Sequence, residues 1–124
     1  MKRILIMDDD AVITMAIGKL IESIGYLVDS CDTGEKAIAL YEKSMRDGAV
    51  YNGALLDYTV NAGLNGIETM QEIIRIHPEA IIFLMTGRVD DPESESWRDL
   101  GFKSVISKPF SLGDLKKEFE RFIL

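Results

Sequence analysis

The chain has 124 residues, 47% of them hydrophobic, which is enough for one buried core and argues against two domains. Its 21 acidic and 14 basic residues give a net charge of -7, which argues against direct nucleic-acid binding through phosphate neutralisation. A single cysteine, Cys31, excludes a disulfide pair and a cysteine-rich metal site. No apolar run approaches the roughly 20 residues that span a bilayer. We therefore expect one domain over residues 1–124, cytoplasmic and without membrane insertion.

Short apolar runs recur along the chain and predict five strands. They lie at residues 4–7, 26–28, 54–56, 80–85 and 105–106. Each run is too short for a helix, whereas the intervals carry apolar residues at helical spacing, most clearly over residues 12–24 and 112–123. We therefore expect five helices, one after each strand.

Polar residues at the starts of these helices have the types that cap exposed backbone amides. Asn65 is followed by Glu68, and Ser111 is followed by Asp114, the spacing at which a cap and a first-turn acid bind each other's amides. Asp10 precedes the first helical stretch and is interpreted as its cap.

Alternation of short strands and helices predicts a parallel sheet that is covered on both faces, an α/β domain of the doubly wound kind. In such sheets, ligands bind outside the carboxyl ends of the strands. The residues that follow the strands are therefore the candidates for function.

These strand-end residues are polar and chemically compatible with one another. The first predicted strand ends in Asp8-Asp9-Asp10, the third in Asp57, the fourth in Thr86 and the fifth in Ser107-Lys108-Pro109. Carboxylates gathered at one edge repel each other unless a cation joins them, and Mg²⁺ is typically held by one or two carboxylates, waters and a phosphate. The pattern predicts a site for Mg²⁺ and a phosphoryl group.

Four strings at these strand ends resemble the receiver domains of two-component response regulators. They are ILIMDDDA, ALLD, FLMTG and VISKPF, in this order, and the resemblance covers essentially the whole chain. It implies a flavodoxin-like sheet in strand order 2-1-3-4-5 and a single-domain receiver of the chemotaxis or sporulation-relay type. It also implies a chain that accepts a phosphoryl group from a sensor histidine kinase or a phosphotransfer protein.

The resemblance implies a role for individual residues. Asp57 is expected to be the phosphoacceptor, becoming a 4-aspartylphosphate, and to ligate Mg²⁺ together with Asp9, Asp8 and the backbone carbonyl of Thr59. Mn²⁺ is an alternative ion. Asp8 is expected to reach the metal largely through water.

Two further residues are expected to contact the phosphoryl group. The Thr86 hydroxyl would hydrogen-bond one phosphoryl oxygen and Lys108 would pair with another, and the Lys108-Pro109 peptide bond is expected to be cis, as in the family. Arg88, which flanks the pocket, is expected to tune hydrolysis of the aspartylphosphate.

Phosphorylation adds about -1.5 to -2 charge beside Thr86, so the surface around the fourth and fifth helices is expected to rearrange and to bind a downstream protein. Trp97 is interpreted either as a packing residue or as part of this partner face. Phosphorylation-dependent dimerisation is a further expectation for the same surface.

Three features depart from the family pattern. The connection between Asp57 and Gly66 holds one residue more than is usual, Val105 stands where an aromatic residue is common, and Trp97 and Phe102 stand where alanines are common. The longer connection bears on metal affinity and on the lifetime of the aspartylphosphate, but not on which residue accepts the phosphoryl group.

Two alternatives remain open at the level of sequence. The same residues would occur in a receiver that is part of a larger DNA-binding regulator or hybrid kinase. A phosphohydrolase with an Asp nucleophile is the alternative from another class. We expect a switch that promotes its own phosphorylation and dephosphorylation rather than an enzyme with an external substrate, because the chain offers no lid to enclose one.

Overall fold

The computed structural model describes residues 1–58, 64–87, 99–108 and 110–123. Five parallel strands form a single sheet in the order β2-β1-β3-β4-β5, which confirms the expected order. The strands are β1 Arg3–Met7, β2 Leu27–Cys31, β3 Gly53–Asp57, β4 Ile82–Thr86 and β5 Ser104–Ser107.

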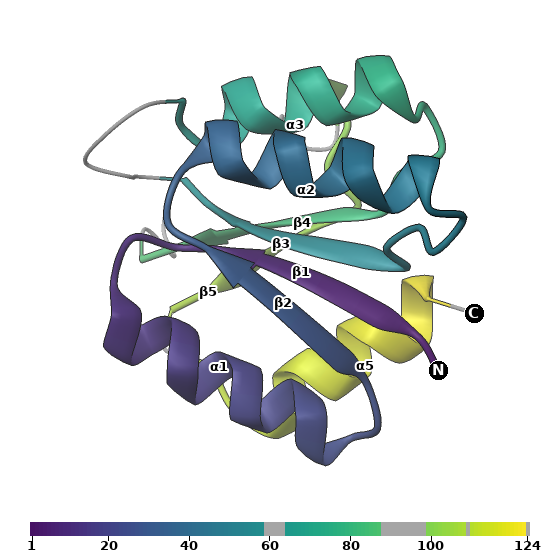
Figure 1. Ribbon diagram of the computed structural model, residues 1–124. Coiled ribbons are helices and arrows are strands. Elements are labelled where there is room, and N and C mark those ends of the chain that lie inside the picture. The colour runs from purple at the N-terminus through teal and green to yellow at the C-terminus, as the bar shows by residue number, and fades with distance from the viewer. Residues whose placement is uncertain (59–63, 88–98, 109, 124) are drawn as a thin grey trace.

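Helices cover both faces of the sheet (Figure 1). They are α1 Ala11–Ser23, α2 Gly34–Arg46, α3 Gly66–Ile76 and α5 Leu112–Phe122. Figure 1 shows α1 and α5 on one face and α2 and α3 on the other. The described residues therefore contain four helices and not the five that were expected, and most of the interval between β4 and β5, residues 88–98, lies outside the described part of the chain.

The alternation of side chains along each strand creates two hydrophobic layers. In β1, Ile4 and Ile6 pack with Ile17, Ile21, Phe83, Leu115 and Phe119 on the α1/α5 face. Leu5 and Met7 point the other way and pack with Ala37, Tyr41, Met70 and Ile73 beneath α2 and α3. Because both faces of the central strands are buried, their sequences are continuously apolar, which explains the short runs that predicted them.

Caps define the helix starts as the sequence indicates. Asn65 with Glu68 and Ser111 with Asp114 both form complete capping boxes. The Asp10 side chain accepts hydrogen bonds from the first amides of α1. Each of these caps begins a helix shortly after a strand ends, so α1, α3 and α5 all start on the side of the sheet where the strands finish.

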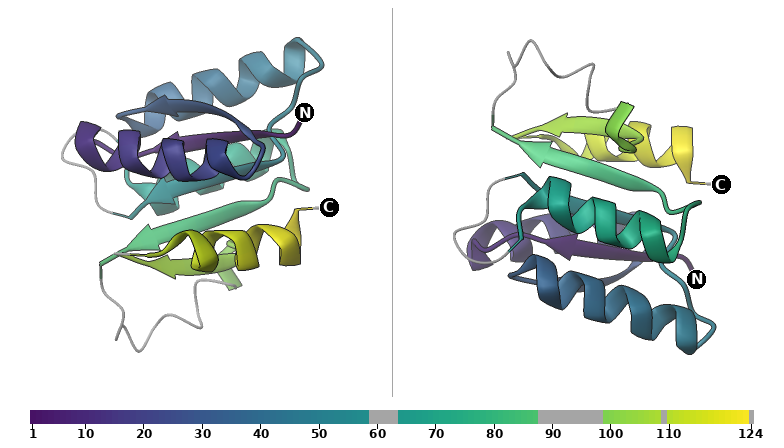
Figure 2. Two further views of the ribbon diagram at one scale, coloured as in Figure 1. Left: turned by 90° about the horizontal axis from the view of Figure 1, so that it is seen from below. Right: turned by 90° about the horizontal axis from the view of Figure 1, so that it is seen from above.

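The strands all end at the edge opposite the chain termini, as the two views of Figure 2 show. The carboxyl ends of β1, β3, β4 and β5 therefore share one edge. Within the described ranges, no helix combines the length and the apolar character needed to cross a membrane.

Candidate phosphoryl and metal site

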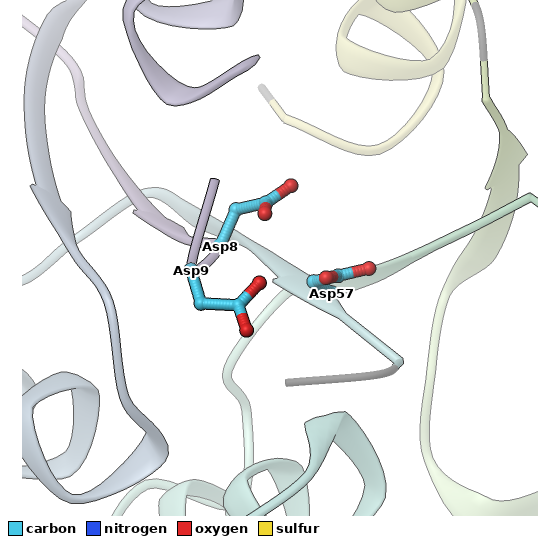
Figure 3. Close-up of side chains that lie close together, drawn as sticks. All are labelled: Asp8, Asp9 and Asp57. Carbon is cyan, nitrogen blue, oxygen red and sulfur yellow. The ribbon is translucent and has the colours of Figure 1, made fainter. Parts of the chain in front are cut away.

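The strand ends bring three carboxylates together. Asp8 and Asp9 follow β1, and Asp57 is the last residue of β3. Each offers an oxygen that lies within 4.8 Å of the others, and Figure 3 shows the three side chains gathered beside the ends of these strands. Asp8 and Asp57 are buried, with 2% and 7% of their surfaces exposed, whereas Asp9 is only partly buried.

Lys108 joins two of these carboxylates. Its Nζ donates to Asp8 Oδ2 at 2.7 Å and to Asp57 Oδ1 at 3.0 Å. The Lys108 backbone amide donates to the Thr86 carbonyl at 2.7 Å, which fixes the lysine beside the end of β4. The sequence placed Asp8, Asp57, Thr86 and Lys108 at one edge, and the structure brings them there.

Thr86 is 4% exposed and is the last residue of β4. Its neighbour in the sheet at this point is Ser107, the last residue of β5. The threonine hydroxyl is therefore confined to the same edge as the carboxylates. Val105 lies two residues earlier in β5, on a strand that alternates buried and half-buried positions.

The electrostatics of the site follow from burial and from the interactions between Lys108 and the carboxylates. Burial is the largest effect on Asp57 and raises its pKa; Lys108 opposes this, and the charges of Asp8 and Asp9 add to it. For Lys108, burial acts to lower the pKa, but its hydrogen bonds to Asp8 and Asp57 outweigh burial and raise it. Both directions reflect a site in which one ammonium serves several carboxylates.

This donor set fits a hard divalent cation. Carboxylate oxygens are the ligands that Mg²⁺ prefers, and the cluster holds three carboxylates, of which Lys108 contacts two. A second cation would relieve the repulsion among the carboxylates. The geometry is consistent with the metal site that the sequence predicts.

Backbone packing holds Asp57 in place. The Gly66 amide donates to the Tyr58 carbonyl at 3.3 Å, and a Cβ on Gly66 would lie 2.6 Å from the Asp57 carbonyl oxygen. Only glycine permits this approach, since real Cβ atoms essentially never come so close. At the other strand, the Asp10 amide donates to Asp8 Oδ1 at 2.9 Å and orients that carboxylate.

Several sequence predictions fall outside the described residues. They concern the Thr59 carbonyl, Arg88, Trp97 and the Lys108-Pro109 peptide bond. Phe102, expected beside the fourth helix, is described and is 2% exposed in the core that underlies α2 and α3.

One contact near the site was missed by sequence reasoning. The Glu35 carboxylate, in the first turn of α2, accepts a hydrogen bond from the Leu64 amide at 2.9 Å. The two residues are far apart in the chain, and no local motif connects them, so the sequence carries no signal for their contact.

Comparison with known proteins agrees with this geometry. A family model described as response regulator receiver domain matches residues 4–120. The response regulator receiver protein CpdR of Brucella abortus is 33% identical, over 100% of this chain and 98% of its own length. A CpxR homologue, a transcriptional regulatory protein of Haemophilus influenzae, is 30% identical over 90% of this chain and 45% of its own length.

Solved structures share the fold. A CheY-like response regulator receiver domain protein from Methanospirillum hungatei superposes with a TM-score of 0.84 at 26% identity, over 98% of this chain and 92% of that one. The receiver domain of the sensor histidine kinase PA1611 from Pseudomonas aeruginosa, with a magnesium ion coordinated in its active site cleft, has a TM-score of 0.85 at 23% identity, over 98% of this chain and 97% of that one. The chain belongs to the family of two-component response regulator receiver domains.

Proposed function

We propose that the chain is a Mg²⁺-dependent switch whose Asp57 accepts a phosphoryl group from a sensor histidine kinase or a phosphotransfer protein. Receiver domains take phosphoryl groups from such donors and act as phosphoacceptor switches. The observation that carries the proposal is the bridge from Lys108 Nζ to both Asp8 and Asp57, within a cluster of three carboxylates at one sheet edge.

The chemistry assigned to Asp57 is nucleophilic. A carboxylate oxygen of Asp57 forms a bond to phosphorus as the bond from phosphorus to the donor's leaving atom breaks. Asp57 must be ionised to attack, and Lys108 favours that form because its ammonium donates to the acceptor. In phosphoryl transfer the protein contributes mainly position and charge, which Lys108 and the Thr86 hydroxyl supply on the oxygens of the transferred group.

The proposed metal ligands are Asp8, Asp9, Asp57 and the Thr59 carbonyl. Bound Mg²⁺ would neutralise charge on the phosphoryl oxygens and on the carboxylates. The magnesium ion in the cleft of the PA1611 receiver domain supports this assignment by similarity of fold. Mn²⁺ satisfies the same oxygen donors.

The proposed output is a change at the surface formed by residues 89–103 and α5. The new phosphoryl oxygens would draw the Thr86 hydroxyl inward, and the segment that follows β4 would move with it. Val105 carries no aromatic ring, so an aromatic rotamer switch has no part in this proposal. Arg88 as a tuning residue and Trp97 on the partner face belong to the same proposal, as does phosphorylation-dependent dimerisation.

Whether the switch acts in a larger protein is a separate question. This chain spans nearly all of CpdR but less than half of the CpxR homologue. The downstream target is proposed only as a protein that recognises the surface formed by residues 89–103 and α5. A phosphohydrolase acting on small esters is not favoured, because the family consists of phosphoacceptor switches.

Intact-protein mass spectrometry tests the proposal. The chain would be incubated with acetyl phosphate and Mg²⁺, alongside Asp57→Asn and the matched control Asp47→Asn, whose exposed carboxylate pairs with Lys43 at the end of α2. We expect one phosphoryl adduct on the wild type and the control, and none on Asp57→Asn or in excess chelator. An adduct that persists on Asp57→Asn, or one that forms without a divalent ion, would contradict the assignment.

A further inference from the structure

The connection that follows Asp57 is held from outside by α2. Glu35 lies in the first turn of α2, and its Oε1 accepts a hydrogen bond from the Leu64 amide at 2.9 Å. Leu64 precedes Asn65, the cap of α3, and α2 and α3 lie side by side on one face of the sheet (Figure 1). The contact therefore ties two helices together at the end that faces the acidic cluster.

We infer that Glu35 is a positioning residue for the phosphorylation site, acting by fixing the point at which the connection from Asp57 returns to α3. The inference rests on the proposed function, because its consequence is expressed in Mg²⁺ affinity. Glu35 acts through Leu64 and Gly66 on the backbone of Asp57.

The return point is coupled directly to the phosphoacceptor. Gly66, two residues after Leu64, donates its amide to the Tyr58 carbonyl, and its α-carbon packs against the Asp57 carbonyl so closely that no Cβ fits. A shift of Leu64 is therefore transmitted to the backbone of Asp57 within a few bonds.

Close packing makes the α2 side of the contact rigid. A Cβ on Gly34 would lie 2.8 Å from both the Cβ and the carbonyl oxygen of Leu64, and 2.1 Å from Thr69 Oγ1. Gly34 is buried at the first position of α2, so the helix start rests on Leu64 itself. The backbone of Glu35, the next residue, is thereby placed beside Leu64.

The Leu64 amide has no acceptor within the cap of α3. In the α3 capping box, the Glu68 carboxylate accepts from the Asn65 amide at 3.1 Å, and the Asn65 side chain accepts from the Glu68 amide at 2.9 Å. Both of these acceptors are used by amides of the capping box itself, those of Asn65 and Glu68. Glu35 supplies the acceptor that the box does not, and a carboxylate makes the stronger kind of hydrogen bond.

The connection is also longer than is usual in the family by one residue, and Asn61 and Gly63 within it are of the types that favour turns. A longer chain segment has more conformations to lose when a metal ligand within it is fixed. An external hydrogen bond at its end reduces that entropic cost, which gives Glu35 a role that a shorter connection would not need.

Two substitutions separate the effect of the hydrogen-bond acceptor at Glu35 from the effect of its negative charge. Glu35→Ala removes both the acceptor and the negative charge, whereas Glu35→Gln keeps an acceptor and removes only the charge. Glu42→Ala is the matched control, since Glu42 is an exposed acid farther along the same helix. The measurements are Mg²⁺ affinity by calorimetric titration, and hydrogen exchange of the Leu64 amide by NMR without metal.

We expect Glu35→Ala to weaken Mg²⁺ binding about fivefold, the loss that corresponds to one hydrogen bond, and to accelerate exchange at Leu64. Glu35→Gln and Glu42→Ala should bind Mg²⁺ within about twofold of the wild type. Equal weakening in Glu35→Ala and Glu35→Gln would overturn the inference in favour of a charge effect. Unchanged affinity in Glu35→Ala would overturn it outright, even where Leu64 exchanges faster.

The test also distinguishes this inference from the proposed function. If the wild type binds Mg²⁺ and Glu35→Ala binds it equally well, the proposed function stands and Glu35 is only a structural anchor. If the wild type binds no Mg²⁺ under native conditions, the proposed metal site fails and the positioning role fails with it.

Discussion

Two ion-pair networks in this molecule differ in charge balance. At the carboxyl ends of the strands, Lys108 is shared by Asp8 and Asp57, with Asp9 beside them. The second network involves the first residue of β1, where Arg3 pairs with Asp29 at 2.7 Å. The first network has more carboxylates than cations, and the second has one of each.

The balanced network is completed by an aromatic residue. The Tyr51 hydroxyl donates to Asp29 at 2.7 Å, and the Arg3 guanidinium lies 4.6 Å from the centre of the Tyr51 ring. Burial by itself would raise the pKa of Asp29, but the hydrogen bonds from Tyr51 and Arg3 outweigh burial and lower it. The ionised form of Asp29 is thus satisfied within the protein.

The opposite pKa directions of Asp57 and Asp29 show what each network does. A carboxylate with a lowered pKa stabilises the fold when it is ionised, whereas the ionised form of one with a raised pKa costs folding free energy, here mainly through burial. The network of Arg3 is therefore structural. The network of Lys108 places three carboxylates around one ammonium, an arrangement consistent with the proposed metal site.

The largest expected difference between the networks is in phosphorylation. Lys108→Ala should slow adduct formation with acetyl phosphate about a hundredfold, because a preorganised donor to the transferred group is lost. Arg3→Ala should leave the rate within about twofold of the wild type, since Arg3 belongs to the balanced network. The rates would be followed by mass spectrometry, and comparable slowing in both variants would remove the distinction.

For stability, the informative comparison is between the Arg3 network and an exposed ion pair. Arg3→Ala should lower the free energy of unfolding by about 1 to 2 kcal/mol, because it removes a partly screened ion pair and the contact with the Tyr51 ring. Lys43→Ala, which breaks an exposed pair with Asp47, should cost less than about 0.5 kcal/mol. Urea unfolding measures both, and equal losses would show that Arg3 contributes no more than a surface pair.

Replacing one carboxylate in each network should change stability in opposite directions. In chelator, Asp57→Asn should raise the free energy of unfolding by about 1 kcal/mol, because it removes like-charge repulsion and a buried charge. Asp29→Asn should lower it by about 1 kcal/mol, because the hydrogen bonds from Arg3 and Tyr51 lose their ionised acceptor. Changes of the same sign would contradict the comparison.

The same two variants should separate the effects of pH. Asp29 has a lowered pKa in the folded state, so its contribution is present above its unfolded pKa of about 3.9 and is lost as the pH falls through the folded value. Asp57 has a raised pKa, so acidification toward that value favours the folded state. The free energy of unfolding should be measured in chelator between about pH 7 and 3. On acidification, Asp57→Asn should lack the stabilisation that protonation of Asp57 gives the wild type, and Asp29→Asn should lack the destabilisation that protonation of Asp29 causes.

Much of the fold was predictable because it follows from local sequence patterns, namely apolar runs and helix caps. The five apolar runs correspond to the five strands, and the caps at Asn65 and Ser111 begin the helices where expected. The strand-end positions of Asp57, Thr86 and Lys108 follow from the same periodicity and from the rule that parallel strands share an edge. The grouping of these residues at one edge was thus predictable from residues that are local to each strand.

The contacts between distant segments were not predictable. His77 caps the end of α3, and its Nδ1 lies 2.8 Å from the hydroxyl of buried Tyr41 on α2, a contact that no local pattern indicates. The Arg3–Asp29 pair and the Glu35–Leu64 hydrogen bond likewise join segments with no shared motif. Such pairings depend on how layers pack, which composition and periodicity do not specify.

The most direct test of the account is the effect of Mg²⁺ on stability. Unfolding would be measured in chelator and in saturating Mg²⁺ for the wild type, Asp9→Asn and Asp29→Asn. Because the ion would bind only the folded site, the wild type and Asp29→Asn should gain stability in proportion to the logarithm of the Mg²⁺ concentration, and Asp9→Asn should gain little. An equal gain in all three proteins, or no gain in the wild type, would contradict the claim that the surplus of carboxylates at the strand ends is a metal site.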